Sequence, residues 1–172
     1  TGAQVVYVHT VTIDIPLPTA IAPTVDAVDC YADIVLPTPT APNDACGTLM
    51  TVISAAVEGA VPACEGDVTY TWTYEDCAGE QVVYVHTVTI DIPLPAAIAP
   101  TVDAVDCYAD IVLPTPTAPN DACGTLMTVI SAAVEGAVPA CEGDVAYTWT
   151  YEDCTGAQVV YVHTVTIDIP LP

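Results

Sequence analysis

The sequence of 172 residues contains no lysine and no arginine, although it contains 22 aspartate and glutamate residues. Its formal net charge at pH 7 is therefore −22. A chain without cationic side chains cannot neutralise phosphate groups, so we exclude nucleic-acid binding. For the same reason it has no basic patch that would hold it on an anionic membrane surface. The absence of lysine also excludes Lys–Asn isopeptide bonds.

Other features that the sequence lacks exclude further classes of protein. No apolar stretch reaches 18 residues without a charge or a proline, so we expect no segment to insert into a membrane. The sequence has no Asn-x-Ser/Thr sequon and no Gly-x-Ser-x-Gly nucleophile motif. We therefore expect neither N-glycosylation nor enzymatic activity. With 53% hydrophobic residues, the chain is too apolar for an acidic disordered tail, so we expect it to fold.

The sequence repeats itself with a period of 77 residues, because the segment that begins at Gln4 returns at Gln81 and Gln158. Two units, 19–95 and 96–172, differ at only four positions. Residues 1–18 duplicate residues 155–172, so we interpret them as the final strand of a preceding repeat. With no initiator methionine and no signal peptide, the chain is interpreted as an excerpt of a longer array.

Strand patterns dominate each repeat. Apolar or aromatic residues alternate with threonine over residues 68–74, and a longer strand is expected over residues 82–92. Shorter strands are expected over Thr24–Val28, Tyr31–Leu36 and Thr48–Val57, with proline- and glycine-rich turns between them. This pattern predicts an all-β protein made of small β-sandwich repeats of 77 residues.

Each repeat has four cysteines, which are Cys30, Cys46, Cys64 and Cys77, then Cys107, Cys123, Cys141 and Cys154. An even number of cysteines in small β modules indicates disulfide bonds and an oxidising, extracellular setting. Zinc is the alternative, but no Cys-x-x-Cys pair occurs.

Strand geometry can rank the three ways of pairing four cysteines. Cys64 and Cys77 bracket a strand of about 23 Å, so a bond between them is disfavoured. If strands alternate in direction, Cys30 shares one end with Cys64, and Cys46 shares the other end with Cys77. The predicted bonds are Cys30–Cys64, Cys46–Cys77, Cys107–Cys141 and Cys123–Cys154. A bridge between neighbouring units, such as Cys64–Cys107, is the alternative.

The segments around three of these cysteines resemble a known family. Pro42 to Gly47 (PNDACG) and Cys64 to Gly79 (CEGDVTYTWTYEDCAG) are similar to the HYR-like repeats of Bacteroidota surface proteins and, more distantly, to the immunoglobulin-like hyalin repeat. The resemblance covers both units and implies tandem immunoglobulin-like modules in large secreted adhesins or gliding-associated filaments, exported by the type IX system. It implies no catalytic residues.

Carboxylates offer the only candidate metal site. Asp26, Asp29, Asp33, Glu65 and Asp67 surround the early strands, and no lysine or arginine can pair with them. Calcium suits facing carboxylates, although the sequence has no Asp-x-Asp-x-Asp-Gly loop, so the alternative is a solvated acidic surface. We expect no other cofactor. His9, His86 and His163 are interpreted as packed or hydrogen-bonded strand residues, and Trp72 and Trp149 as core residues rather than a carbohydrate platform.

The sequence thus favours a structural role over a catalytic one. We expect a disulfide-stabilised, self-assembling repeat segment of a long extracellular bacterial filament or adhesin shaft, whose partners are other copies of the same chain. The alternative is an adhesive binding module that recognises a glycan or a surface and is rigidified by calcium. That alternative predicts loops that vary between units, whereas the two units are nearly identical.

Overall fold

The computed structural model describes residues 2–139 and 141–170, in which each repeat forms four strands and one short 3-10 helix. The first repeat contains β1 (Thr24–Val28), η1 (Tyr31–Asp33), β2 (Thr51–Glu58), β3 (Gly66–Glu75) and β4 (Gln81–Ile90). The second contains β5 (Thr101–Val105), η2 (Tyr108–Asp110), β6 (Thr128–Glu135), β7 (Gly143–Glu152) and β8 (Gln158–Ile167). Tandem all-β repeats are therefore confirmed. In these ranges no helix is long and apolar enough to cross a bilayer.

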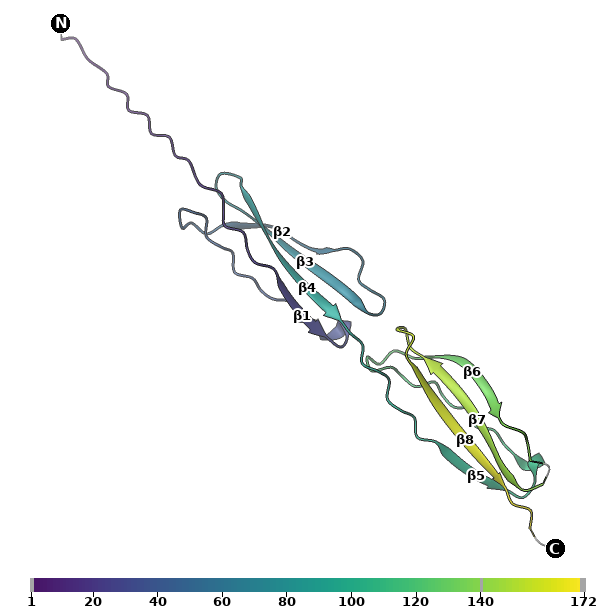
Figure 1. Cartoon of the computed structure of the whole chain (residues 1–172). Coiled ribbons are helices and arrows are strands. Elements are labelled where there is room, and N and C mark those ends of the chain that lie inside the picture. Colours follow the sequence, from purple (N-terminus) through teal and green to yellow (C-terminus); the bar gives the residue numbers. More distant parts are fainter. Residues whose placement is uncertain (1, 140, 171–172) are drawn as a thin grey trace. The chain divides into compact units, whose positions relative to one another are not determined.

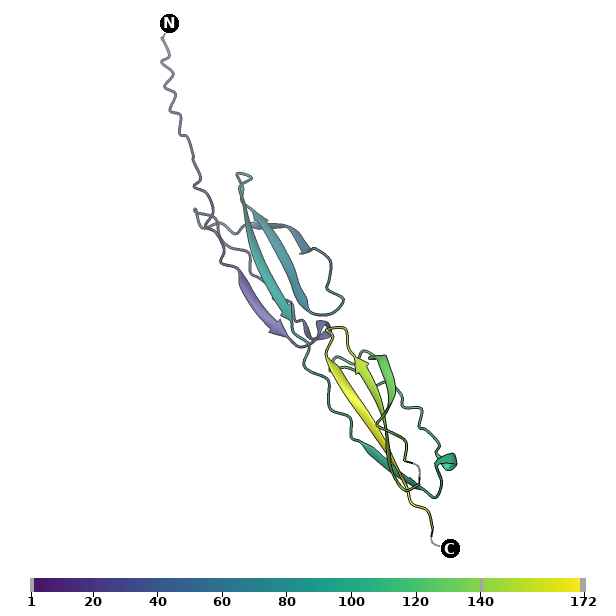
Figure 2. The ribbon, with the colours of Figure 1, turned by 45° about the vertical axis from the view of Figure 1, so that its right-hand side comes forward.

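Each repeat forms one four-stranded sheet, in the order β1-β4-β3-β2 in the first and β5-β8-β7-β6 in the second (Figure 1). In the second sheet β5 runs parallel to β8, whereas β7 is antiparallel to both β8 and β6 (Figure 2). The register pairs Gly143 with Ile167, and Thr128 with Glu152. One end of the sheet therefore holds the ends of β5 and β8 and the start of β7, and the other end holds the end of β7 and the start of β6.

Alternation along the two central strands gives each sheet one buried face. In the second repeat the core side chains are at most 8% exposed, and they are Met127, Val145, Tyr147, Tyr151, Val159, Tyr161, Val165 and Ile167. Ile98 and Ala118 pack against this core from extended chain outside the strands. The layer opposite the sheet is therefore built by extended segments of the described chain rather than by a second hydrogen-bonded sheet.

The expected strands correspond closely to the observed ones, with one exception. Thr24–Val28 matches β1 residue for residue, and residues 68–74 and 82–92 fall on β3 and β4. The strand predicted over Tyr31–Leu36 is wrong, because the chain turns there into η1. The N–H of Asp33 donates to the carbonyl of Cys30 (2.9 Å), a local bond that replaces a sheet partner.

Residues 2–18 form no strand, and their side chains are largely exposed, as in Val5 (95%) and Tyr7 (85%). The same sequence forms the central strands β4 and β8, where Tyr84 and Tyr161 are only 8% exposed. A strand forms only where partner strands accept its backbone hydrogen bonds. The assignment of residues 1–18 to a preceding repeat stays a prediction, and its Thr1 lies outside the described residues.

The chain forms two compact units whose limits differ from those of the repeats. The first holds the chain up to Asp26, together with Val35–Ala60 and Val68–Thr87. The second holds the chain from Val88 onward, together with Ala27–Ile34 and Val61–Asp67. Residues 88–95 and two short internal segments of the first repeat therefore belong to the second unit, and each of the two internal segments contains a cysteine. The predicted boundaries 19–95 and 96–172 stay predictions, and Ala140, Leu171 and Pro172 lie outside the described residues.

Candidate functional site

Two disulfide bonds within the second compact unit join one repeat to the next. Cys30 is bonded to Cys123, and Cys64 is bonded to Cys154, with Cα–Cα distances of 5.6 and 5.7 Å. Cys30 and Cys64 come from the first-repeat segments Ala27–Ile34 and Val61–Asp67 of this unit. Their sequence separations of 93 and 90 residues exceed the length of the repeat. Both bonds are therefore crosslinks between consecutive repeats.

The pairing predicted from the sequence is wrong. None of the four predicted bonds forms, and Cys46, Cys77, Cys107 and Cys141 are free and exposed. The predicted positions of the cysteines at the ends of each sheet are correct, because Cys30 follows β1 and Cys64 precedes β3. The predicted partners are wrong because each bond joins two repeats instead of closing within one. The alternative of a bridge between units is the correct class, although the partners are not Cys64 and Cys107.

Cys123 lies in a tight loop that the carboxylate of Asp121 organises. The Oδ1 of Asp121 accepts hydrogen bonds from the backbone N–H groups of Cys123 (2.9 Å) and Thr125 (2.8 Å). The N–H of Asp121 donates to the carbonyl of Thr125 (2.8 Å), which closes the loop. Gly124 has φ +83°, a left-handed conformation that glycine adopts without a steric penalty. The loop therefore fixes the backbone on both sides of Cys123.

Cys154 lies in a second loop, which Asp153 organises in the same way. The Oδ1 of Asp153 accepts hydrogen bonds from the N–H groups of Thr155 (2.8 Å) and Ala157 (2.9 Å) and from the hydroxyl of Thr155 (2.7 Å). Burial opposes ionisation of this carboxyl group, but the hydrogen bonds from Thr155, Ala157 and Gly156 outweigh it and lower the pKa of Asp153 below its ordinary value of 3.8. The loop is thus held by charge-assisted hydrogen bonds.

The partner cysteines also lie in ordered turns. Cys30 caps η1 in an extended conformation, with φ −134° and ψ 149°. Cys64 lies in the turn before β3, where Gly66 has φ +139° and a Cβ atom would lie 3.3 Å from the side chain of Pro62. All four bonded cysteines are therefore presented by turns that the local sequence determines.

The predicted calcium candidates are Asp26, Asp29, Asp33, Glu65 and Asp67. Among the described residues, no group of three or more His, Cys, Asp or Glu side chains could hold a metal ion. The Oδ2 of Asp26 lies 3.6 Å from the Nε2 of His86, and the Oδ1 of Asp67 accepts a hydrogen bond from Thr89 (2.7 Å). The arrangement of these carboxylates therefore gives no support to a calcium site.

His86 and His163 are buried, as expected for packed strand residues, and each joins two strands of its sheet. The expectation is wrong for His9, which is exposed and lies in no strand. In the second repeat, the Nδ1 of His163 lies 2.8 Å from the Oγ1 of Thr101, which also lies 2.5 Å from the hydroxyl of Tyr161. The Nε2 of His163 lies 3.6 Å from a carboxylate oxygen of Asp103. These contacts attach β5 to β8.

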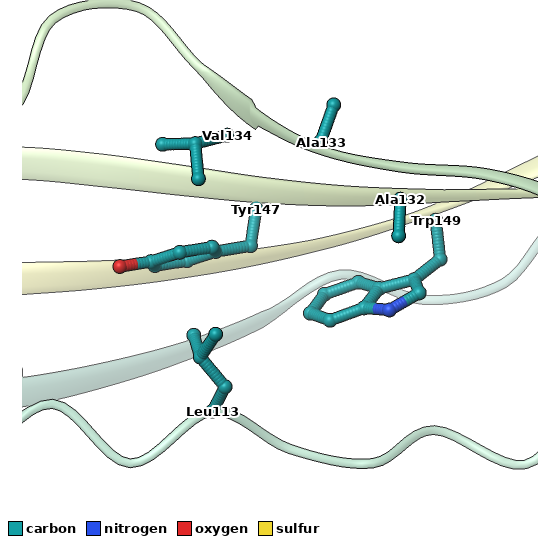
Figure 3. Close-up of a pocket in the computed structure, with 6 residues that line it drawn as sticks. All are labelled: Leu113, Ala132, Ala133, Val134, Tyr147 and Trp149. Carbon is teal, nitrogen blue, oxygen red and sulfur yellow. The ribbon is translucent and has the colours of Figure 1, made fainter.

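A shallow apolar groove of about 240 Å³ lies beside β6 and β7 (Figure 3). Its lining residues are Leu113, Ala132, Ala133, Val134, Tyr147 and Trp149. Trp149 packs against the core, as expected, and its ring centroid lies 5.5 Å from that of Tyr161. The lining has no charged side chain, so the groove offers apolar contact only.

The model of the family described as "HYR-like domain with 4 cysteines" matches residues 18–90 and 95–167. The chain belongs to this family. Comparison with curated proteins gave no match. The HYR-like repeat is a non-catalytic extracellular module, and the disulfide bonds agree with an extracellular domain. The HYR-like resemblance noted from the sequence is confirmed, whereas a Bacteroidota origin stays a prediction.

The matched ranges contain all eight cysteines, so the bonds can be assigned to positions within the HYR-like repeat. Each repeat carries two cysteines at one end of its sheet and two in Asp-organised loops at the other end. Each bond of this chain joins a cysteine at the first end of one repeat to a cysteine in an Asp-organised loop of the next repeat. What this site does chemically is to crosslink consecutive HYR-like repeats.

Proposed function

We propose that this chain is a structural segment of a long extracellular filament or adhesin shaft at a bacterial cell surface. The observation that carries the proposal is the pair of disulfides between consecutive repeats, Cys30–Cys123 and Cys64–Cys154. A small module that needs only its own fold stabilised gains that stability from bonds inside the module. Bonds that leave the module connect it to its neighbour, which serves a mechanical purpose.

The junction has three covalent connections, because the peptide chain runs beside the two disulfides. The peptide segment between β4 and β5 is residues 91–100, and it contains Pro93, Pro95 and Pro100. Prolines favour extended chain and resist bending. A force along the chain is therefore shared between covalent bonds, and the disulfides limit how far the segment can extend or twist.

The outer strands support self-assembly with other copies of the chain. In the second repeat β6 is an edge strand, and its Val129, Ile130 and Val134 are each 45–49% exposed. An edge strand presents unpaired backbone groups that another strand can pair with. Because the repeat is nearly identical in each unit, a weak lateral contact recurs along the chain and its effect accumulates. The charge of −22 keeps such an apolar fibre dispersed in water.

Electron microscopy of the native secreted material tests the filament role. We expect straight fibres with a constant axial repeat that is longer than β4 alone, which at about 3.3 Å per residue spans about 33 Å. Flexible, single-file beads would contradict a self-assembled shaft.

The role of the junction bonds is tested on the 172-residue chain by small-angle X-ray scattering. The variant Cys30→Ser/Cys64→Ser removes both bonds, and we expect it to give a broader distribution of dimensions. The matched control Cys46→Ser/Cys77→Ser removes two free cysteines and, with all three proteins measured as the monomer fraction from size exclusion, should scatter like the wild type. Equal scattering from all three proteins would contradict a mechanical role for the bonds.

The apolar groove supports a second candidate function, that of an adhesive binding module. A half-buried tryptophan that lines an apolar groove is suited to stacking against a sugar ring, and the same groove occurs in the first repeat, where it includes Trp72. Glycan binding that is lost in Trp72→Ala and Trp149→Ala would favour this function. Absence of binding to a broad set of glycans would remove it.

A further inference from the structure

The junction inside this chain follows a simple pairing rule. Cys123 occupies in the second repeat the position that Cys46 occupies in the first, and Cys154 occupies the position of Cys77. The position of Cys30 in one repeat is therefore bonded to the position of Cys46 in the next. In the same way, the position of Cys64 is bonded to the position of Cys77 in the next repeat.

The four free cysteines are those that this pairing rule leaves without a partner among the described residues. Cys46 and Cys77 are of the kind that bonds an earlier repeat, and Cys107 and Cys141 are of the kind that bonds a later one. All four are exposed. In each repeat the two kinds lie at opposite ends of the sheet. We call each such pair of free cysteines a half-junction. One half-junction is Cys46 with Cys77 in the first repeat, and the other is Cys107 with Cys141 in the second repeat.

The half-junction in the first repeat already has the conformation of its bonded counterpart. The Oδ1 of Asp44 accepts hydrogen bonds from the N–H groups of Cys46 (2.9 Å) and Thr48 (2.7 Å), which match the distances of 2.9 and 2.8 Å around Cys123. The glycine of the loop has φ +83° in both repeats. The loop of Cys77 likewise keeps the two backbone hydrogen bonds to its aspartate, at 2.8 and 2.9 Å. These loops form whether or not their cysteine is bonded.

The half-junction in the second repeat shows the same agreement. Free Cys107 has φ −138° and ψ 149°, and bonded Cys30 has φ −134° and ψ 149°. The glycine after free Cys141 has φ +141°, and the glycine after bonded Cys64 has φ +139°. A new junction therefore requires no change in the local backbone of either half.

We propose that Cys107 and Cys141 of one copy of this chain bond to Cys46 and Cys77, respectively, of a second copy, so that copies join head to tail. This inference rests on the proposed function, because it names the bonds that continue the shaft. The second copy supplies the repeat whose cysteines pair with these free ones.

Each bond forms by thiol–disulfide exchange with a small-molecule disulfide such as glutathione disulfide. The thiolate of Cys107 attacks that disulfide and releases one small thiol. The thiolate of Cys46 of the second copy then displaces the other small thiol. Two protein thiols are thus oxidised, their two protons pass to the released small thiolates, and one small disulfide is reduced to two thiols. Once one bond has formed, the second is intramolecular and forms at a high effective concentration.

Two variants, each with a single half-junction, test the inference on the full chain. One is Cys46→Ser/Cys77→Ser, and the other is Cys107→Ser/Cys141→Ser, with one of them labelled with ¹⁵N. Both are oxidised in a glutathione mixture and separated on non-reducing gels. We expect each variant alone to stay monomeric, the mixture to give heterodimers, and the wild type to give a ladder that lengthens with concentration. Dimers from either variant alone would overturn head-to-tail pairing.

The isotope label is needed because the sequences around Cys30 and Cys107 are identical, as are those around Cys46 and Cys123. We expect heterodimers to yield labelled–unlabelled peptide pairs that join Cys107 to Cys46 and Cys141 to Cys77. The opposite partners, or closure of Cys46 on Cys77 or of Cys107 on Cys141 within one chain, would overturn the inference.

A fourfold variant with all four free cysteines changed to serine separates this inference from the proposed function. In it, mapping should find only Cys30–Cys123 and Cys64–Cys154. If these bonds form but the wild type gives no ladder, the inference fails and the proposed function stands. If they do not form, the observation that carries the proposed function is lost, and the pairing rule with it.

Discussion

Thr101 in β5 and His163 in β8 are register partners joined by a 2.8 Å hydrogen bond between Oγ1 and Nδ1. The hydroxyl of Tyr161 lies 2.5 Å from the same Oγ1, so one threonine serves two buried side chains. Four of the five residues of β5 are exposed, which leaves this strand few apolar contacts with the sheet. The attachment of β5 therefore depends on this polar cluster.

The variant Thr101→Val tests that dependence. It keeps the shape of the side chain but leaves the Nδ1 of His163 and the hydroxyl of Tyr161 without this partner. We expect the free energy of unfolding, measured with urea, to fall by about 1–3 kcal/mol. The control Thr117→Val changes an exposed threonine and should lie within about 0.5 kcal/mol of the wild type. Equal effects of the two variants would contradict a role for the cluster.

The loops that present the cysteines depend on glycine in a left-handed conformation. Gly124 has φ +83°, and a Cβ atom there would meet nothing within 4 Å, so any cost of Gly124→Ala arises from the backbone alone. We expect the free energy of unfolding of this variant, measured by chemical denaturation, to be about 1–2 kcal/mol lower than that of the wild type. The control Gly2→Ala, where nothing lies nearby and no positive φ occurs, should show no loss. Unchanged stability of Gly124→Ala would mean that the loop tolerates another conformation.

The sequence predicts the features of this fold that are set by local pattern. Alternation of residue types identifies β3 and β4 because each strand buries one face, and the turn residues mark the loops. It cannot predict which copy of a cysteine is bonded, because Cys46 and Cys123 lie in identical surroundings. The contact between Thr101 and His163 spans 62 residues of sequence and follows from a parallel strand pairing that no local pattern reveals.

Acid should weaken the loop of Cys154. Because the pKa of Asp153 is lowered by its hydrogen bonds, its ionised form stabilises the folded state above about pH 3.8, and this contribution is lost as the pH falls through the folded-state pKa. We expect Thr155→Ala, which removes the 2.7 Å hydrogen bond to Asp153, to lower stability by about 1–2 kcal/mol at pH 7. The difference from the wild type should shrink in unfolding titrations below that pH.

The first repeat offers a matched control for this change, because it has Ala78 where the second has Thr155. Ala78→Thr should act in the opposite direction and raise stability at pH 7. A difference between Thr155→Ala and the wild type that stayed constant down to pH 2 would contradict a role for the ionised carboxylate.

Divalent cations should act on the charge of the chain rather than at a built site. The five candidate carboxylates are not gathered into a metal-binding group within the described residues. We expect the melting temperature, measured by circular dichroism, to be unchanged by a chelator. Calcium and magnesium should raise it equally at matched ionic strength, because both only screen repulsion among the 22 acidic residues. A rise specific to calcium would instead establish a calcium site.

Alkali should destabilise the core through Tyr151, which is 1% exposed and whose hydroxyl has no hydrogen-bond partner among the described residues. Burial, and then the proximity of Tyr161, raise the pKa of Tyr151 above its ordinary value of 10.0. The unfolded chain therefore ionises first, so stability is complete below pH 10 and declines as the pH rises above it. We expect Tyr151→Phe to be neutral, or stabilising by up to about 1 kcal/mol, at pH 7. It should also reduce the loss of stability above pH 10, measured by urea unfolding.

The matched variant Tyr161→Phe removes a hydroxyl that does have a partner, Thr101, and should be destabilising at pH 7. If Tyr151→Phe were the more damaging of the two, the hydroxyl of Tyr151 would have to make a hydrogen bond that stabilises the fold.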